Sequence, residues 1–72
     1  MSIANKLKNS REISGLSVSQ VANSLNVSES FVESVELGKA QPTSDFLDSF
    51  YSLIVEALRF RFLHIFQAQA RL

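Results

Sequence analysis

The chain has many serines and one histidine, His64, which are the residue types of a serine nucleophile and its general base. A serine nucleophile needs a base such as histidine within hydrogen-bond reach, and in one large class of hydrolases it lies in a Gly-x-Ser-x-Gly turn. The sequence contains no such turn, and no His/Asp arrangement accompanies the serines. We therefore interpret the serines as helix caps and helix surface, and we expect that the protein is not an enzyme.

Metal binding is not expected either. The chain has no cysteine, so it offers no thiolate ligand and no disulfide, and its one histidine lacks the partners of a zinc site. We expect no metal and no cofactor, and we interpret His64 as a surface or interface residue. The absence of cysteine is typical of a reducing compartment, and the cytoplasm is the location that we expect.

Length and charge limit the remaining classes. Seventy-two residues form one small domain near the lower limit of what folds alone, and oligomerisation is a common remedy. The apolar region 46–66 contains Asp48, Glu56, Arg59 and Arg61, which are costly in a bilayer, and the first ten residues do not resemble a signal peptide. We expect no membrane partner. Seven basic and seven acidic side chains leave no net charge, whereas strong nucleic-acid binders usually carry a basic excess.

Residues 17–25 are predicted to form a short helix. Ser17 is a typical N-cap, and Gln20, three residues later, completes a capping box. Apolar residues then follow at helical spacing, and the small Ala22 allows a second helix to cross closely. Asn26 tolerates the left-handed conformation in which many helices end.

A second short helix is predicted directly after this turn. Ser28 is its N-cap candidate, and Phe31, Val32 and Val35 lie on one face. Gly38 stands where a C-terminal glycine cap belongs. Two short helices joined by a tight turn are therefore expected between residues 17 and 38.

This stretch resembles the helix-turn-helix of the phage repressor and Cro-like family, also called XRE-type. The matching segments are GLS at 15–17, VA at 21–22, LNVS at 25–28 and VELGKAQP at 35–42. The resemblance covers about residues 6–53 and implies an all-α, lambda-repressor-like bundle of four to five helices. It also implies a sequence-specific regulator of transcription that binds double-stranded DNA as a homodimer, with the second short helix in the major groove.

The resemblance further implies roles for particular residues. In the family, residues at the positions of Arg11 and Glu36 form a partly buried ion pair that joins the first and third helices. The family's DNA contacts fall on six positions of this chain, which are Val18, Glu29, Ser30, Glu33, Ser34 and Lys39. Ser17 and Ser28, at the N-termini of the two short helices, are candidates for contacts with DNA phosphates through their hydroxyls.

A second function stays open because the predicted contact surface is acidic. Glu29 and Glu33 would face a groove lined with phosphates, which lowers affinity unless each carboxylate finds a donor. The alternative is a protein-interaction module with weak or no DNA binding, such as an antitoxin, an antirepressor or an assembly factor. In a third interpretation, these polar residues are only the solvated face of an amphipathic helix.

Two further helices are predicted outside this pair. The first extends from Ser2 to about Ile13, with Ile3, Leu7 and Ile13 turned inward, and ends at Gly15. The last starts at Thr43 or Ser44 and continues to about Ala70, because no Gly, Pro or Asn follows Pro42. A strand over 58–66, where apolar residues and arginines partly alternate, is the alternative to the helix at that point.

The C-terminal part of this last helix is predicted to bind a second copy of the chain. We assign residues 1–57 to a helix-turn-helix domain and residues 58–72 to a helical extension of the same domain. The extension carries more apolar side chains than a small monomer can cover. The predicted dimerisation residues are Leu58, Phe60, Phe62, Leu63, Ile65 and Phe66.

Overall fold

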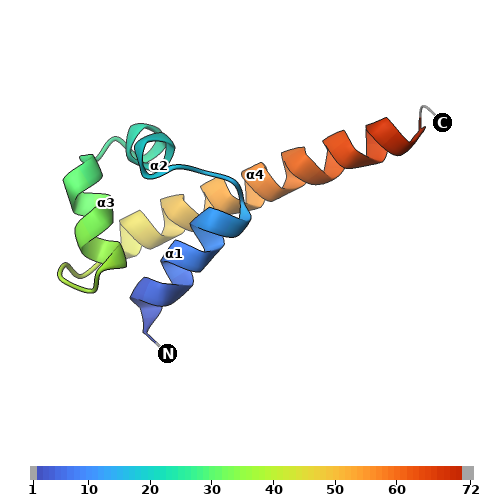
Figure 1. Cartoon of the computed structure of the whole chain (residues 1–72). Helices are drawn as coiled ribbons and strands as arrows, with labels where there is room; N and C mark the ends of the chain where they lie inside the picture. Colours follow the sequence, from blue (N-terminus) through green and yellow to red (C-terminus); the bar gives the residue numbers. More distant parts are fainter. Residues whose placement is uncertain (1, 71–72) are drawn as a thin grey trace.

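The structure is a computed structural model that describes residues 2–70, and the side chains of residues 2–63. It is all-helical over these residues and contains four helices (Figure 1). The region 58–66 is helical, so the alternative of a strand there is wrong. The four helices are α1 (Ile3–Ile13), α2 (Val18–Leu25), α3 (Glu29–Glu36) and α4 (Ser44–Ala70).

Each helix begins with a hydroxyl cap, as the sequence predicts. The hydroxyl oxygens of Ser2, Ser17 and Ser28 each accept a hydrogen bond from the backbone N–H three residues later, and Thr43 does the same at the start of α4. The backbone N–H of Ser17 also donates to the side-chain oxygen of Gln20 at 2.8 Å, which completes the capping box. These caps satisfy amides that have no partner inside the helix.

The three connections between helices each contain a residue in the left-handed conformation. Gly15 and Gly38 have φ values of 75° and 78°, and Asn26 has φ 58° and ψ 45°. Asn26 is the only non-glycine residue with positive φ among the described residues, and asparagine tolerates this conformation better than most residues do. These residues turn the chain within a few positions, so that three short helices stack closely.

The core lies where α1, α2, α3 and the first half of α4 meet. Its aromatic part comes from α4: the Phe46 and Phe50 rings stack with centroids 6.0 Å apart, and Phe31 of α3 packs edge-on against Phe46 at 5.4 Å. Phe50, Leu7 and Val21 are at most 1% exposed. The whole cluster consists of Leu7, Val21, Ala22, Val32, Val35, Phe46, Phe50 and Ile54.

The inward face of α1 is narrower than the sequence predicts. Leu7 is buried, but Ile3 and Ile13 are 44% and 67% exposed, so the expectation that they turn inward is wrong. Helical geometry gives the reason for Ile13, because at 100° per residue it lies about 120° around α1 from Leu7. Ile3 lies only about 40° around from Leu7, but it is the first residue of the helix and is exposed at its end. The core faces Leu7 and Ala4 and does not reach the opposite side of the helix.

Helix α4 extends far beyond the other three helices. With 27 residues it is about 40 Å long at the standard rise per residue, and the chain measures 47 × 26 × 18 Å. Its last core residue is Ile54, after which the helix leaves the body of the domain (Figure 1). Among the described residues, no helix has both the length and the hydropathy that crossing a membrane requires.

Candidate functional site

Helices α2 and α3 form a closely packed pair joined only by residues 26–28. Ala22 is 3% exposed at their contact, and its carbonyl accepts a hydrogen bond from the Val27 N–H at 3.0 Å. A larger side chain at Ala22 would separate the two helices. Beneath the pair, Val32 and Val35 of α3 are buried in the core, which fixes the rotation of α3 about its axis.

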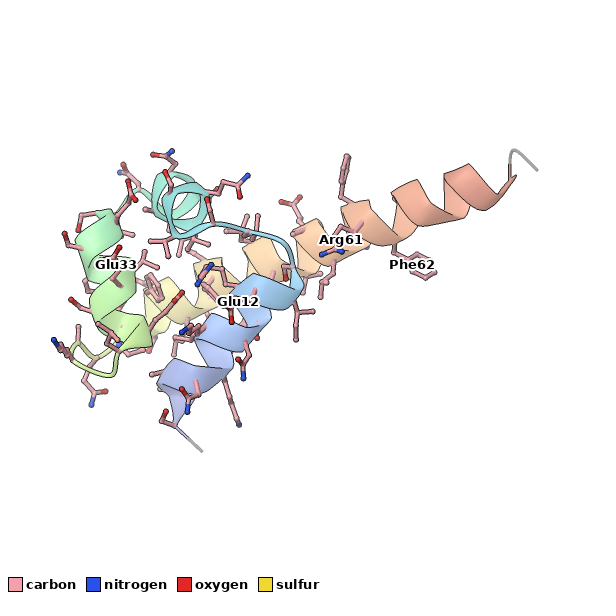
Figure 2. All side chains as sticks on the ribbon, in the orientation of Figure 1. Glu12, Glu33, Arg61 and Phe62 are labelled. Carbon is pink, nitrogen blue, oxygen red and sulfur yellow. The ribbon has the colours of Figure 1, made fainter. Side chains whose placement is uncertain are left out.

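Three of the predicted contact residues lie on the outward surface of α3. Glu29, Ser30 and Glu33 are exposed, and Figure 2 shows Glu33 on this helix. Ser34 is only half-buried, so part of its side chain also reaches solvent. We call Glu29, Ser30, Glu33 and Ser34 the α3 surface; it is polar, carries two carboxylates, and is exposed at Glu29, Ser30 and Glu33.

Lys39 follows α3 in a fixed position. Its backbone N–H donates to the Ser34 carbonyl at 2.8 Å, and the N–H of Ala40 donates to the same oxygen at 3.2 Å. These bonds close the end of α3 after Gly38 and hold the exposed Lys39 side chain beside the last turn. A cation at this place complements the negative end of the helix dipole.

Ser17 and Ser28 lie at the N-termini of α2 and α3, and both are exposed. Their oxygens accept the capping hydrogen bonds at 3.0 and 3.1 Å. Each hydroxyl hydrogen can therefore still donate to an outside acceptor, such as a phosphate oxygen. Val18 differs from them, because it is half-buried and packs against the core, so only part of its side chain faces solvent.

Arg11 and Glu36 form the ion pair that the resemblance implies. The Arg11 Nε and Nη2 atoms donate to the two carboxylate oxygens of Glu36 at 2.7 and 3.1 Å, and Nη1 donates to the Leu16 carbonyl at 2.9 Å. The two side chains are 12% and 9% exposed. The hydrogen bond to Glu36 raises the pKa of Arg11 above its ordinary value, which keeps the guanidinium charged. The pair joins α1, the following loop and α3.

Acidic and basic groups lie close together beside the α3 surface. Lys8 of α1 lines the same shallow depression of about 250 Å³ as Glu33 and Leu37. A lysine at this place can compensate part of the negative charge of α3 at short range. Lys6 and Lys39 are also exposed and lie outside this depression.

The six predicted dimerisation residues do not share one surface. Leu58 and Phe62 lie on one side of α4, while Phe60 and Leu63 lie on another, where they line a groove with Leu16. All four are large apolar residues that are between 41% and 73% exposed. The side chains of Ile65, Phe66 and His64 lie outside the described residues.

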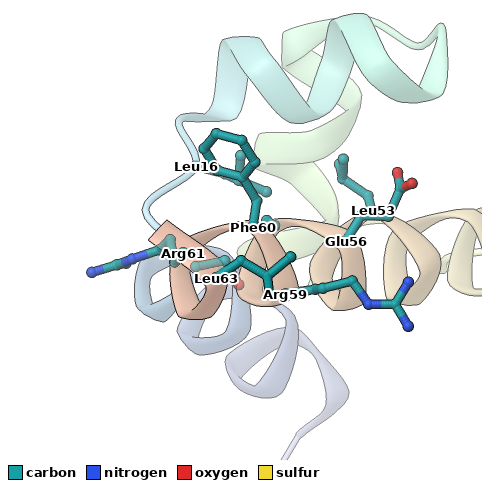
Figure 3. Close-up of a pocket in the computed structure, with 9 residues that line it drawn as sticks. Leu16, Leu53, Glu56, Arg59, Phe60, Arg61 and Leu63 are labelled. Atoms are coloured by element: carbon teal, nitrogen blue, oxygen red, sulfur yellow. The ribbon is translucent and has the colours of Figure 1, made fainter. Parts of the chain in front are cut away.

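The groove beside Phe60 has an apolar lining. It has a volume of about 580 Å³ and lies between the α1–α2 loop and α4 (Figure 3). Leu16 and Leu53 form the side nearest the core, and Phe60 and Leu63 form the outer side. The groove opens beside the α4 extension and away from the α3 surface.

Sequence reasoning missed two features of α4. Tyr51 and Val55 are 44% and 60% exposed and continue the side that holds Leu58 and Phe62. The sequence already indicates this, because Tyr51, Val55 and Leu58 follow one another at intervals of four and three residues, which places them on one side of a helix. The other feature is Arg61, whose Nη1 donates to the carbonyl of Ile13 at 2.8 Å and so caps the C-terminus of α1 (Figure 2). No sequence pattern predicts this cap.

No arrangement of residues in the described part of the chain indicates a reactive centre. No group of three or more His, Cys, Asp or Glu residues is placed to hold a metal ion there. The features that stand out are the α3 surface with its flanking lysines and the exposed apolar sides of α4. No family model matches this chain, and no curated protein or solved structure shows significant similarity to it.

Proposed function

We propose that this protein is a helix-turn-helix regulator of the phage repressor and Cro-like type, with a lambda-repressor-like fold, that binds double-stranded DNA as a homodimer. The α2–α3 pair would be the helix-turn-helix, and α3 would lie in the major groove. The observation that carries the proposal is the α3 surface. It is short, polar and uncovered, and the Arg11–Glu36 pair and the core hold it rigidly from below.

The contacts divide into two kinds. Glu29, Ser30, Glu33 and Ser34 would meet base edges, where a carboxylate accepts from the amino group of cytosine and serine hydroxyls bond to several bases. Ser17, Ser28 and Lys39 would contact the phosphates. Val18 would add an apolar contact to a base edge, the thymine methyl. Phosphate contacts position the protein, and the α3 surface supplies sequence preference.

The negative charge of the α3 surface means that two copies of the chain are needed for a useful affinity for DNA. Lys39 is the strongest phosphate contact of one copy, and each neutralised phosphate contributes to affinity through counterion release. With two carboxylates on α3 opposing it, one copy would bind weakly at physiological salt. A dimer doubles the contacts and joins two half-sites about one helical turn apart.

The proposal is tested by measuring the affinity for mixed duplex DNA over a salt series. We expect log affinity to fall linearly with log salt, with a slope of about −0.9 for each phosphate contact. Lys39→Ala should weaken binding on every sequence and reduce the slope by about one unit per copy. An affinity that does not respond to salt, or no binding at low salt, contradicts the proposal.

A matched pair of variants tests whether the α3 surface faces the DNA. Glu33→Gln and Glu12→Gln remove the same charge from two exposed side chains, one on α3 and one on α1 (Figure 2). Removing a carboxylate close to phosphates should raise affinity about threefold, while the change on α1 should have a smaller effect. Equal effects of the two variants would mean that DNA does not approach α3.

The second candidate function is a protein-interaction module. It is favoured by the two exposed carboxylates of the α3 surface and by the neutral charge of the chain. In this case α3 would bind a basic protein surface, and duplex DNA would not compete for it. The salt series separates the two candidates, because only the first predicts binding to mixed duplex DNA.

A further inference from the structure

We propose that two copies of this chain pair in antiparallel orientation through one side of α4, which consists of Tyr51, Val55, Leu58 and Phe62. We call these four residues the α4 seam. The inference deepens the homodimer of the proposed function by naming its contact surface and its orientation. It does not depend on DNA binding.

The spacing of the seam is that of a coiled coil. Tyr51, Val55, Leu58 and Phe62 follow one another at intervals of four, three and four residues. Apolar residues at alternating intervals of three and four form a stripe along one side of a helix, and this stripe packs against the same stripe of another helix. The seam belongs to a helix that is continuous over this whole stretch.

The seam is uncovered in the single chain. Its residues are 44%, 60%, 41% and 69% exposed, in chain order, whereas Phe50 and Ile54 on the core side of α4 are 1% and 6% exposed. Water contact with four large apolar side chains in one row is unfavourable, and burying their exposed parts against another copy stabilises the contact. Phe62 projects from the part of α4 that lies beyond the body (Figure 2).

The distribution of charge along α4 selects a second copy in the antiparallel orientation. Asp45 and Asp48 lie near the N-terminal end of the seam, Glu56 lies near its middle, and Arg59 lies towards its C-terminal end. All four side chains are exposed, and none takes part in an ion pair among the described side chains. A parallel pair would bring the two acidic ends to one level and the two Arg59 side chains to another. An antiparallel pair instead brings the acidic end of each helix towards the basic end of the other.

One antiparallel register keeps all four seam residues in contact. It places Tyr51 of one copy against Phe62 of the other, and Val55 against Leu58. At the standard rise, Asp48 and the other copy's Arg59 are then about 9 Å apart along the axis, so their attraction is weak at physiological salt and becomes stronger as the salt is lowered. The two helix dipoles also run in opposite directions, which is favourable.

The antiparallel pair fits the elongated shape of the molecule, in which α4 extends beyond the other helices. The C-terminal half of each α4 extends beyond its own body, and the seam begins at Tyr51, beside the body (Figure 1). In the antiparallel pair, the extension of one copy lies along the body of the other. Each copy thus covers apolar surface that the other one exposes.

Cysteine cross-linking of the full chain tests the orientation, because the natural sequence has no cysteine. We expect a mixture of Tyr51→Cys and Phe62→Cys chains to form disulfide-linked heterodimers under mild oxidation, identified by mass. Either variant alone should cross-link poorly, since its two cysteines would be about 16 Å apart in the antiparallel register, too far for a disulfide. Asn9→Cys, on the exposed surface of α1, is the control and should not cross-link.

Efficient cross-linking of each variant with itself would indicate a parallel pair and overturn the proposal. A second measurement covers the case in which the cysteine variants fail to associate. Arg59→Glu should weaken self-association in sedimentation, and adding Asp48→Lys to it should restore the association, because the charges are then exchanged between the ends. If the double variant associates no better than Arg59→Glu, the antiparallel pair is wrong.

The outcome for DNA is separate from the outcome for the seam. Cross-linking as expected without DNA binding would overturn the proposed function and leave the antiparallel pair standing. DNA binding by a chain that stays monomeric would overturn the antiparallel pair and the homodimer of the proposed function, and would leave only the DNA-binding role standing.

Discussion

The outward surfaces of α3 and α4 differ in chemistry, although both helices pack an apolar side against the same core. In α3 the core buries Val32 and Val35, and the outward surface is polar. In α4 the core ends at Ile54, and large apolar residues such as Phe62 stay exposed beyond it. The body of the domain thus covers the apolar side of α3 completely, whereas α4 carries apolar surface that no described residue covers.

The largest expected effect is a loss of folding stability when the Arg11–Glu36 ion pair, which supports α3, is broken. Glu36→Gln removes the charge that faces Arg11, and Arg11 is left with an uncompensated charge at a nearly buried position. Losing one partner of such a pair should lower the free energy of unfolding by about 3 kcal/mol. Urea denaturation followed by circular dichroism measures this loss.

Glu33→Gln is the control for this change, because it alters the same side-chain type on the exposed side of the same helix. Its effect on the free energy of unfolding should stay within about 0.5 kcal/mol. If the two variants unfold at the same urea concentration, the Arg11–Glu36 pair does not support α3 as described.

The second effect is on association through the α4 seam. Leu58→Asp combined with Phe62→Asp places two carboxylates on the seam and should weaken self-association about a hundredfold or more, since two large apolar side chains lose their burial. Sedimentation at micromolar concentration should give the mass of one chain. The body should stay folded, because both residues lie beyond the core.

Phe60→Asp is the matched control for the seam. Phe60 is 73% exposed on the same helix, but it lines the groove beside Leu16 and not the seam. The variant should associate like the natural chain. Dissociation by Phe60→Asp, with no effect of the seam variant, would move the interface to the groove.

The helices and their ends could be predicted from the sequence because the signals there are local. The caps at Ser17 and Ser28 and the left-handed residues Asn26 and Gly38 depend only on neighbours within a few positions. The long α4 was predictable for the same reason, because no residue after Pro42 favours a break.

Side-chain placement was harder to predict because it depends on how far the core extends. Ile13 has the residue type of a core position, but it lies about 120° around α1 from Leu7, and the core does not extend that far around the helix. The predicted dimerisation residues lie on two sides of α4, because the prediction joined the stripe of Leu58 and Phe62 with the neighbouring residues Phe60 and Leu63 into one wide apolar surface. The cap that Arg61 provides for Ile13 joins residues 48 positions apart, so it follows from the folded chain and not from any motif.

The smallest expected effect tests how the α4 extension is joined to the body. Gly15 has φ 75°, and a Cβ atom added there would lie 3.1 Å from Nη1 of Arg61, the atom that caps Ile13. Gly15→Ala should therefore cost about 1 kcal/mol for the backbone conformation and a further fraction for displacing Arg61. Gly38→Ala is matched in φ, at 78°, but meets nothing closer than the Ala4 Cβ at 4.0 Å, so it should cost only the backbone part. Thermal unfolding measures both. In an Arg61→Gln background the difference between the two glycine variants should shrink, and a difference that persists there would show that Arg61 does not hold the extension against the body.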